Sequence, residues 1–414
     1  MSSTSVRPES GIRALPREIW ILVIGGFIVA VGMGIVAPAL PTFATSFDVG
    51  VTAASFVISA FALMRLAFAP VSGRLVSWFG ERPTYLWGIT IVGVSTAACA
   101  LADSYWQLLV FRALGGTGST MFTVSGVALL IRLSPPHLRG RASGVWATSF
   151  LMGNISGPII GGLLVGFSLR LPFVIYGIAL FVAAFVGWAM LRRSTLAAPQ
   201  PDRRVPGMSV REALSHRAYR AAIVSNFSNG WAVFGVRIAL VPLFVVEVLR
   251  TDQAMAGFAL SVFAVGNAAV LMISGRMADQ RGRRPLVLVG LAVSAVGTSA
   301  LGLTESVPLF LAASLVAGIG AGLLNPAQNA AVADVVGSGR GGPVLAAFQM
   351  AADFGAILGP LVAGVLADAV SFRAAFAVTG LTAVLALLVW ARAPETRVAP
   401  VAEEKEEEPR RVAD

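Results

Sequence analysis

The sequence predicts an all-α polytopic membrane protein, with twelve transmembrane helices in two pseudo-symmetric six-helix bundles around a central cavity. Three observations predict this fold. Of the 414 residues, 56% are hydrophobic and only 13% are charged, whereas soluble domains carry about a quarter charged residues. Continuous apolar runs long enough to cross a hydrocarbon layer of ~30 Å recur along the chain. Short sequence matches recur at a constant offset, for example between residues 72 and 274.

The apolar runs are expected to form helices, because only helices and closed barrels satisfy their backbone in lipid and these runs do not alternate. The first run is too long for a signal peptide and lacks a small-residue cleavage site, so we expect it to be a retained span. The twelve approximate ranges are 19–43, 52–73, 84–102, 106–131, 142–167, 171–191, 219–245, 254–275, 285–303, 308–332, 343–367 and 372–391.

The basic residues predict the orientation of the spans. Most of the 31 Lys and Arg residues fall on the side of the amino terminus, and only Arg170, Arg250 and Arg373 fall on the other. By the positive-inside rule, both termini are expected in the cytoplasm of a multi-pass protein of the cell (inner or plasma) membrane. The net charge of +10 does not indicate nucleic acid, because neither aromatic interleaving nor a known binding fold accompanies it.

A basic, proline-containing loop divides the spans six and six. The expected parts are a cytoplasmic N-terminal segment (1–18), an N-terminal bundle (19–191), a cytoplasmic linker (192–218), a C-terminal bundle (219–391) and an acidic cytoplasmic tail (392–414). The charge run at 403–411 is typical of a disordered, solvated end. The lipid bilayer is an expected partner, and we expect a monomer.

Three matched segments indicate that the two bundles are repeats. "SGRLVSWFGERPTYLWG" (72–88) and "SGRMADQRGRRPLVLVG" (274–290) agree at eight of seventeen positions. "GNISGPIIGG" (153–162) aligns with "GAILGPLVAG" (355–364), and "RALGGTG" (112–118) with "SLVAGIG" (314–320), at the same offset. Six spans per half give both halves the same topology. Parallel repeats of this kind rock against each other around a site near the midplane of the membrane.

Polar residues within the spans predict which helices face the interior, because such residues are costly in lipid and usually face protein or a cavity. They avoid the third, sixth, ninth and twelfth spans, which we therefore expect to face lipid. For the nonpolar candidates, simple packing or lipid contact is the competing interpretation. The expected lining of the substrate cavity is Met33, Arg65, Arg112, Asn154, Trp231, Phe234, Arg237, Asn325, Asn329, Gln349 and Asp353.

Asp353 is the one acidic residue deep inside an expected span, about ten residues or ~15 Å into the eleventh. A carboxyl group at that depth is a candidate for proton exchange. The competing interpretation is a structural ion pair with Arg65, Arg112 or Arg237. Arginine does not release its proton, so these three side chains can act only as fixed charges.

Glycine–proline segments in the fifth and eleventh spans allow two interpretations. Small residues four apart let helices approach closely, and proline bends a helix. Close packing and a role in gating both remain open. The residues of this helix-packing motif are Gly153, Gly157, Pro158, Gly355, Gly359 and Pro360.

Several of these segments resemble signatures of the major facilitator superfamily, and within it of the twelve-helix drug:proton antiporters. "GRMADQRGRRP" (275–285) matches its loop signature, and "FRALGGTG" (111–118), which carries Arg112, is similar to its helix-four signature. "GNISGPIIGG" resembles the helix-five signature of exporters, and "GIVAPALP" (34–41) the start signature of the drug group. The resemblance implies that Arg112 supports proton coupling and that helices one, four, seven and ten line a central cavity.

The sequence departs from those relatives in two ways. Helix one has no acidic residue between Trp20 and Phe43, so either Asp353 substitutes for it or the coupling differs. The interior also carries three arginines against one aspartate. If all four line the path, neutral or anionic amphiphiles fit better than lipophilic cations.

The resemblance places each gating loop beside the start of helix five or eleven of the opposite half. Asp279 would then face Arg139 and Arg141, because a negative group complements a helix amino terminus, whereas the other loop has only Ser77 there. The offset also predicts two charge pairs of reversed sign, Glu81 with Arg132 and Arg283 with Asp334. Unrelated solvated charges are the alternative. The loop glycines are Gly73, Gly80, Gly275 and Gly282.

The expected function is proton-coupled export of small amphipathic molecules, such as drugs or antibiotics, by alternating access. A metabolite or sugar transporter of the same fold, or a non-transporting sensor, is the alternative. No enzyme or ATP-driven pump is expected, because HExxH and Walker motifs and buried Ser–His or Cys–His arrangements are absent from the sequence. Neither a cofactor nor a metal is expected, since Cys99 is alone in its span and His137 and His216 fall in loops.

Overall fold

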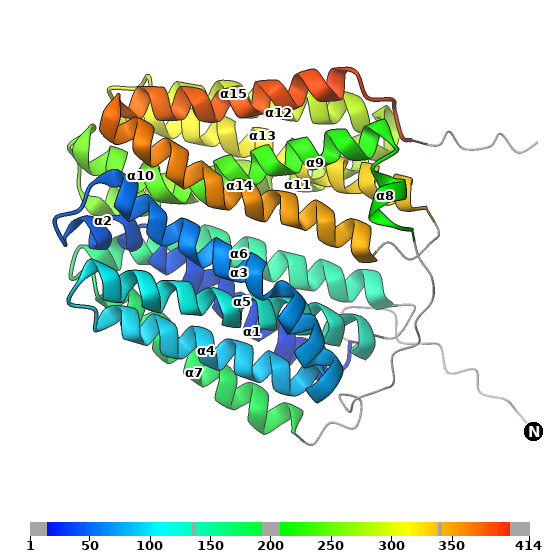
Figure 1. The fold of residues 1–414 in the computed structure, drawn as a ribbon, viewed down its shortest axis with the longest axis horizontal. Coiled ribbons are helices and arrows are strands. Elements are labelled where there is room, and N and C mark those ends of the chain that lie inside the picture. Colours follow the sequence, from blue (N-terminus) through cyan, green and yellow to red (C-terminus); the bar gives the residue numbers. More distant parts are fainter. Residues whose placement is uncertain (1–14, 135–137, 193–207, 338–341, 398–414) are drawn as a thin grey trace, which may run out of the picture.

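The structure, a computed structural model, describes residues 15–134, 138–192, 208–337 and 342–397. Most of the predicted N-terminal segment, linker and tail, together with His137, lies outside the described residues. Within those ranges, 12 helices are long and apolar enough to cross a membrane, which confirms the predicted fold class. They form two groups, an N-terminal half and a C-terminal half (Figure 1).

In the N-terminal half, the first span consists of two helices, because Pro38 and Pro41 lack the N–H that would continue the first one. Each of the other five spans is one helix. The elements are α1 (Arg17–Val36), α2 (Ala39–Thr45), α3 (Val51–Phe79), α4 (Glu81–Ala100), α5 (Tyr105–Leu133), α6 (Arg139–Val165) and α7 (Leu171–Leu191).

In the C-terminal half, a seven-residue π-helical segment interrupts the seventh span. Such segments are rare and mark a local departure from regular helix geometry. The elements are α8 (Val210–Ala213), α9 (Arg217–Asn229), η3 (Gly230–Val236), α10 (Arg237–Glu247), α11 (Gln253–Arg281), α12 (Arg283–Leu301), α13 (Val307–Val336), α14 (Gly342–Ala369) and α15 (Phe372–Ala391).

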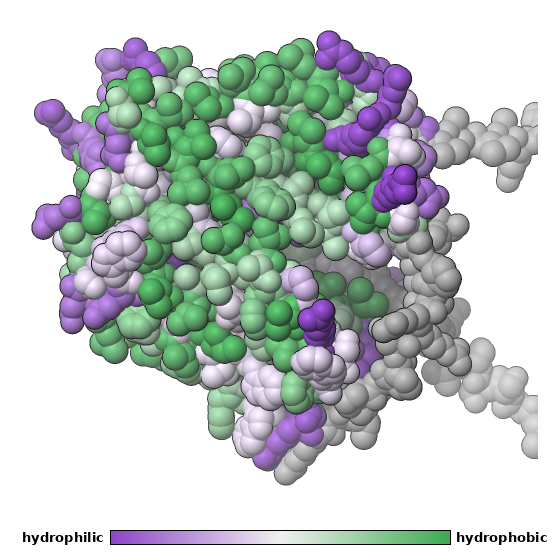
Figure 2. All heavy atoms as spheres, in the orientation of Figure 1, coloured by the Kyte–Doolittle hydropathy of each residue, from purple (hydrophilic) through white to green (hydrophobic). Residues whose placement is uncertain are grey.

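The helices that lack interior polar residues lie on the outside of the molecule. Helices α4 and α7 pack mainly on the N-terminal half, and α12 and α15 mainly on the C-terminal half. The two halves meet through α3 with α14 and through α6 with α11. Much of the outer surface is apolar, as a surface in contact with lipid requires (Figure 2).

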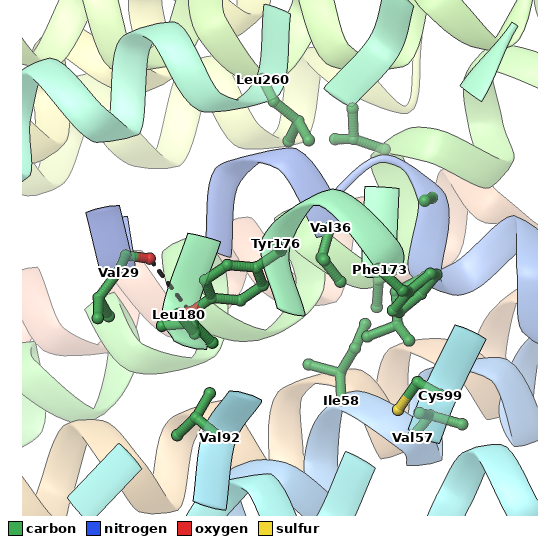
Figure 3. Close-up of a cluster of buried hydrophobic side chains, with 14 of the residues drawn as sticks. Val29, Val36, Val57, Ile58, Val92, Cys99, Phe173, Tyr176, Leu180 and Leu260 are labelled. Carbon is green, nitrogen blue, oxygen red and sulfur yellow. Dashed lines mark hydrogen bonds between the residues drawn. The ribbon is translucent and has the colours of Figure 1, made fainter. Parts of the chain in front are cut away.

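The core of the N-terminal half is closely packed around Tyr176 of α7 (Figure 3). Its ring occupies the space beside Gly32 of α1, where any Cβ would collide with it. Its hydroxyl donates a hydrogen bond to the carbonyl of Val29 at 3.3 Å, so the buried polar atom is satisfied. Cys99 is fully buried in the same cluster and is a free cysteine.

We call the end of the molecule that carries Gly80 and Gly282 the terminal end, because the described chain also begins and finishes there (Figure 1). The other end, which carries Gly50 and Asp368, is the opposite end. At the opposite end the two halves are in contact along two seams.

The first seam joins α3 to α14. The carboxylate of Asp368 accepts hydrogen bonds from the backbone N–H of Val51 at 3.0 Å, and from the backbone N–H and hydroxyl of Thr52 at 2.8 and 2.6 Å. Further toward the centre, the Ser59 hydroxyl donates to the carbonyl of Ile357 at 2.7 Å. A carboxylate at a helix amino terminus satisfies N–H groups that have no partner within the helix.

The second seam joins α6 to α11 and carries no charge. A Cβ at Gly257 would collide with the carbonyl oxygen of Pro158, and a Cβ at Gly162 would lie 2.7 Å from that of Ala254. The Ser261 hydroxyl donates to the carbonyl of Ile155 at 2.9 Å. Contact between the two backbones closes this side.

At the terminal end, the same four helices stand apart. A Cβ added at Gly73 of α3, Gly144 of α6, Gly275 of α11 or Gly342 of α14 would meet nothing within 4 Å. Figure 2 shows the hollow between the two halves at this end. The structure is therefore closed at the opposite end and open at the terminal end.

Candidate functional site

One ion pair joins the two halves in the middle of the spans. A guanidinium nitrogen of Arg65 on α3 lies 4.0 Å from a carboxylate oxygen of Asp353 on α14. The two side chains are 24% and 20% exposed, so they border accessible space. Of the three arginines considered as partners for Asp353, the structure pairs it with Arg65.

Neighbouring side chains hold this pair in place. The other terminal nitrogen of Arg65 donates to the hydroxyl of Ser119 on α5 at 3.1 Å. The hydroxyl of Thr120 donates to the backbone carbonyl of Arg65 at 2.8 Å. Gln349, one turn before Asp353 on α14, hydrogen-bonds to its carboxylate. Each charge is thus oriented by its own half, while the attraction between them crosses the boundary.

Arg112 of α5 lies inside the N-terminal half. Its side chain is only 7% exposed, and its guanidinium stacks over the ring of Phe61 at 4.1 Å. Its Nε is buried and has no hydrogen-bond partner among the described residues. It lines a small internal cavity together with Met33 and Tyr176.

Arg237 of α10 has the corresponding environment in the C-terminal half. Its guanidinium lies 4.0 Å from the ring centroid of Phe263, which occupies the same repeat position as Phe61. It donates to the carbonyls of Val233 and Leu260 at 3.3 and 3.4 Å. In this conformation Arg112 and Arg237 are not beside the Arg65–Asp353 pair, and their place in one substrate cavity stays a prediction. Aromatic rings hold Arg112 and Arg237 within separate halves. The expectation of neutral or anionic substrates depended on all four charged residues lining one path, so this conformation does not support it.

Trp231 is buried in this conformation, and its place in the substrate cavity stays a prediction. It is 7% exposed, and its indole N–H donates to the hydroxyl of Thr379 on α15 at 3.3 Å. The ring packs against neighbouring helices and is therefore not exposed to a cavity. Phe234, Asn154 and Asn329 are exposed, and their place in a substrate path stays a prediction.

A buried polar network crosses the C-terminal half. The amide of Gln328 on α13 donates to Asn226 at 3.2 Å and to Asn325 at 3.1 Å. Its oxygen accepts from the hydroxyl of Ser225 at 2.8 Å, and that hydroxyl accepts from the indole of Trp390 at 3.0 Å. A satisfied network of this kind rigidifies the core that contains it. Asn325 is therefore tied to this network, in which Ser225 and Trp390 were not among the residues predicted from the sequence.

The glycine–proline motif packs each half against itself. On α6 the two glycines face the backbone of α1, and on α14 they face α9 and η3. A Cβ at any of these positions would come within 3.0 Å of another helix, so close packing accounts for the glycines. The helices continue through both prolines. The residues concerned are Gly153, Gly157, Pro158, Gly355, Gly359 and Pro360.

The structure brings together both charge pairs expected at the terminal end. Arg132 lies 2.7 Å from Glu81, and Arg283 lies 3.1 Å from Asp334. Each pair ties the start of one helix, α4 or α12, to the end of the next, α5 or α13. Gly80 and Gly282 precede these helices with φ angles of 84° and 103°, which glycine adopts without strain.

Asp279 does not form the expected contact with the start of α6. Its carboxylate lies 2.6 Å from Arg283 in the next helix, and its side chain is 71% exposed. Arg141 is exposed, and the side chain of Arg139 lies outside the described residues. The hydroxyl of Ser77 donates to the carbonyl of Gly73 in its own helix. Because the halves stand apart at this end, a latch between them remains a prediction for the closed state.

Two arginines at matching repeat positions cap the last helix of each half. Arg82 donates to the carbonyls of Leu191 and Arg192 at 3.0 and 3.1 Å. Arg284 donates to the carbonyls of Trp390 and Ala391 at 3.4 and 2.6 Å. A cation is favourable where helix carbonyls lack partners. The sequence signal was the arginine shared by both copies of the loop.

Glu395 holds the segment after α15 to the start of α12, a contact within the C-terminal half. Its carboxylate accepts hydrogen bonds from the backbone N–H groups of Arg283 at 2.8 Å and of Arg284 at 3.0 Å. Although partial burial acts to raise the pKa of Glu395, four backbone N–H donors hold it below its ordinary value. The start of the predicted tail (392–414) is therefore docked against α12. Among the described residues, no cluster of three or more His, Cys, Asp or Glu side chains could hold a metal ion.

This fold and site define a multi-pass membrane protein of two similar halves, with a mid-membrane ion pair between them and an opening on one side. The chain belongs to the Major Facilitator Superfamily, whose sequence model matches residues 22–236 and 222–414. The family that the sequence motifs resemble is thus confirmed.

Individual relatives cover most of the chain. It is 27% identical over 399 residues to the "Multi-drug resistance efflux pump PmrA homolog" of Lactococcus lactis subsp. lactis, spanning 90% of this chain and 94% of that protein. It is 27% identical over 343 residues to the "Tetracycline resistance protein, class C" of Escherichia coli, spanning 80% and 85%. A bacterial homologue of the human lysosomal transporter Spinster, in an inward-facing and unoccupied conformation, shares the fold with a TM-score of 0.79 at 16% identity, covering 92% and 98%.

Proposed function

We propose that this protein is a monomeric transporter of the cell membrane that exports small amphipathic molecules in exchange for protons, with both termini in the cytoplasm. The Arg65–Asp353 pair carries this proposal, because it places an ionisable group between the two halves of a structure open on one side. Relatives described as drug efflux and tetracycline resistance proteins support export.

The distribution of basic residues supports this orientation. With the terminal end in the cytoplasm, Arg170, Arg250 and Arg373 are the only Lys or Arg residues on the external side among those that the structure describes. The open hollow then faces the cytoplasm, and the closed seams face outward. A substrate enters this conformation from the cytoplasm or from the adjoining leaflet.

Exchange with protons follows from the charge of Asp353. Two unit charges at 4.0 Å attract each other by at most about 4 kcal/mol at an effective dielectric constant of 20, and partial exposure reduces this. Protonation of Asp353 removes the attraction between α3 and α14. A shift of a two-state equilibrium from 1:99 to 99:1 requires about 5.5 kcal/mol, so loss of this pair alone does not reverse the balance. In an exchange, substrate and proton occupy the protein in turn, and each drives the conformational change in the direction opposite to the other.

Efflux from a drug-hypersensitive host tests the proposal. Cells expressing the protein are expected to accumulate less of several chemically distinct amphipathic compounds, and an uncoupler is expected to abolish the difference. Accumulation is measured with and without the uncoupler, with empty-vector cells as the control. Uncoupler-insensitive efflux contradicts proton exchange. Transport of a single polar metabolite indicates a metabolite carrier, and no transport indicates a sensor.

The charge pairs at the terminal end are proposed to brace the gating loops. Glu81→Arg is expected to reduce efflux at least about two- to five-fold, because it sets two positive charges together where the side chains are only 16% and 19% exposed, and even a fully exposed pair contributes roughly 0–1 kcal/mol. Combining Glu81→Arg with Arg132→Glu is expected to restore efflux. Thermal stability is measured alongside, and Arg392→Gln, which changes an exposed arginine at the end of α15, serves as a control outside the pair. Failure of the double variant to recover argues against the brace.

A further inference from the structure

A groove on the outside of the N-terminal half has no part in the proposed transport. It encloses about 400 Å³ between α4 and α7, near their terminal ends. Trp87 and Leu86 of α4, Phe185 and Trp188 of α7, and Arg82 are among its lining residues. Both helices lie on the outer surface of the molecule, so the groove opens toward lipid.

The aromatic side chains of this groove are exposed. Trp87 is 44% exposed, Trp188 is 49% exposed and Phe185 is 66% exposed. Trp87 also packs edge-on against Phe79, with ring centroids 5.2 Å apart. Tryptophan is enriched where a membrane meets water, because its ring is apolar and its N–H is polar. These rings therefore mark the headgroup level of the leaflet at the terminal end.

The mouth of the groove is positively charged. Arg82 is fixed there by its two hydrogen bonds to the carbonyls that end α7. The guanidinium of Arg192 lies 4.7 Å from the ring of Trp188. None of the described residues that line the groove is acidic. An apolar trough that ends in two guanidinium groups complements a molecule with an acyl chain and an anionic head.

We propose that this groove binds an anionic phospholipid from the leaflet at the terminal end. The phosphate lies beside Arg82 and Arg192, since guanidinium groups pair with phosphate oxygens in fixed geometry. One acyl chain lies along Trp87 and Phe185. Basic pockets between transmembrane helices on the cytoplasmic side bind anionic headgroups by the same chemistry.

The duplicated half lacks this combination. At the repeat positions of Trp87 and Phe185, the C-terminal half carries Val289 and Leu387. The tryptophan at the position of Trp188 is Trp390, which is fully buried and bonded to Ser225. An acid, Glu395, lies against the backbone of Arg284 there. The groove is therefore particular to one half, and one lipid per chain is expected.

Native mass spectrometry of the full-length protein in detergent tests the site. Phosphatidylglycerol and phosphatidylcholine with identical acyl chains are added in turn at matched concentrations. We expect a single retained phosphatidylglycerol with at least ten-fold preference over phosphatidylcholine. The double variant Trp188→Leu with Arg192→Gln is expected to lose that preference. Equal retention of the two lipids by the native protein overturns the proposal.

Control variants separate the site from general effects of charge. Arg392→Gln removes an exposed arginine at the terminal end of α15 and is expected to leave the preference unchanged. Trp87→Leu changes the other wall of the groove, does not touch Arg192, and is expected to weaken retention several-fold. If Arg392→Gln lowers the preference as much as the double variant does, the groove is not the binding site. The same conclusion follows if both groove variants retain the lipid as the native protein does. Efflux measured on the same variants reports whether they fold.

Discussion

Replacing Asp353 by asparagine is expected to abolish uphill export while leaving downhill movement of substrate intact. Asparagine keeps the size of the side chain and one acceptor oxygen, but it replaces the other oxygen by an NH2 donor and carries no exchangeable proton. The attraction to Arg65 is then absent at every stage of the cycle, so a proton gradient no longer biases the two halves. We expect the driven rate to fall by at least about 100-fold, which corresponds to about 2.7 kcal/mol.

Proteoliposomes with an imposed pH gradient measure this effect directly. Substrate movement is followed with the gradient and after its collapse, for the native protein and for Asp353→Asn. Arg65→Gln is expected to impair the driven rate as well, and Arg65→Lys to retain part of it. Asp103→Asn removes an exposed carboxylate paired with Arg170 within one half and is the matched control. A full driven rate in Asp353→Asn contradicts the role proposed for this carboxylate.

Replacing Asp368 by alanine is expected to open the seam between α3 and α14. The substitution removes the acceptor for three hydrogen bonds at the start of α3 and leaves two backbone N–H groups without it. Hydrogen bonds to a charged group contribute about 1.5–3 kcal/mol when buried, and water replaces part of that at a surface. We expect the balance to move ten- to 100-fold toward the state that is open at the opposite end.

Cysteine labelling reads out this shift. Ser55 is fully buried in the seam, beside the backbone of Gly364, so Ser55→Cys is expected to react with a membrane-impermeant maleimide only when the seam opens. Cys99 is the single native cysteine and is buried, which keeps the background low. Asp368→Asn retains one acceptor oxygen and should give an intermediate labelling rate. The control Asp103→Asn should leave the labelling rate unchanged. An unchanged rate in Asp368→Ala would show that other contacts hold the seam.

The features that the sequence predicted correctly depend on signals carried along the chain itself. Span length follows from the number of consecutive apolar residues, and the charge pair of Glu81 with Arg132 follows from its sign-reversed copy in the second half. The polar composition of the helices also predicted which of them lie outside. Each of these inferences needs only the order of residues and the constant offset of the repeat.

The arrangement of the interior could not be predicted in the same way. A span in an apolar environment has no strong hydrophobic face, so its rotation about its axis is set by contacts with other helices. This is why Arg112 and Arg237 were expected in a shared cavity, although each stacks on an aromatic ring inside its own half. Which of three arginines meets Asp353 also depends on that rotation.

Two further differences have other causes. The carbonyls that accept from Arg82 and Arg284 lie more than 100 residues away, and backbone acceptors leave no mark in a sequence. The expected contact of Asp279 with the opposite half depends on conformation, because the helices that would meet are apart at the terminal end.

The two seams at the opposite end differ in chemistry. The contact between α6 and α11 can act as a hinge, whereas the contact between α3 and α14 depends on a charged group that can be neutralised. Close contact between glycines and carbonyls, with the hydrogen bond from Ser261 to Ile155, holds α6 to α11, and the residues described at this seam carry no charge. The carboxylate of Asp368 holds α3 to α14 by hydrogen bonds that a change of charge weakens. Any influence that neutralises this carboxylate therefore loosens one edge of the molecule and leaves the other closed. The first movement at this end is then a rotation of one half about the contact between α6 and α11, rather than a separation of the two halves along a straight line.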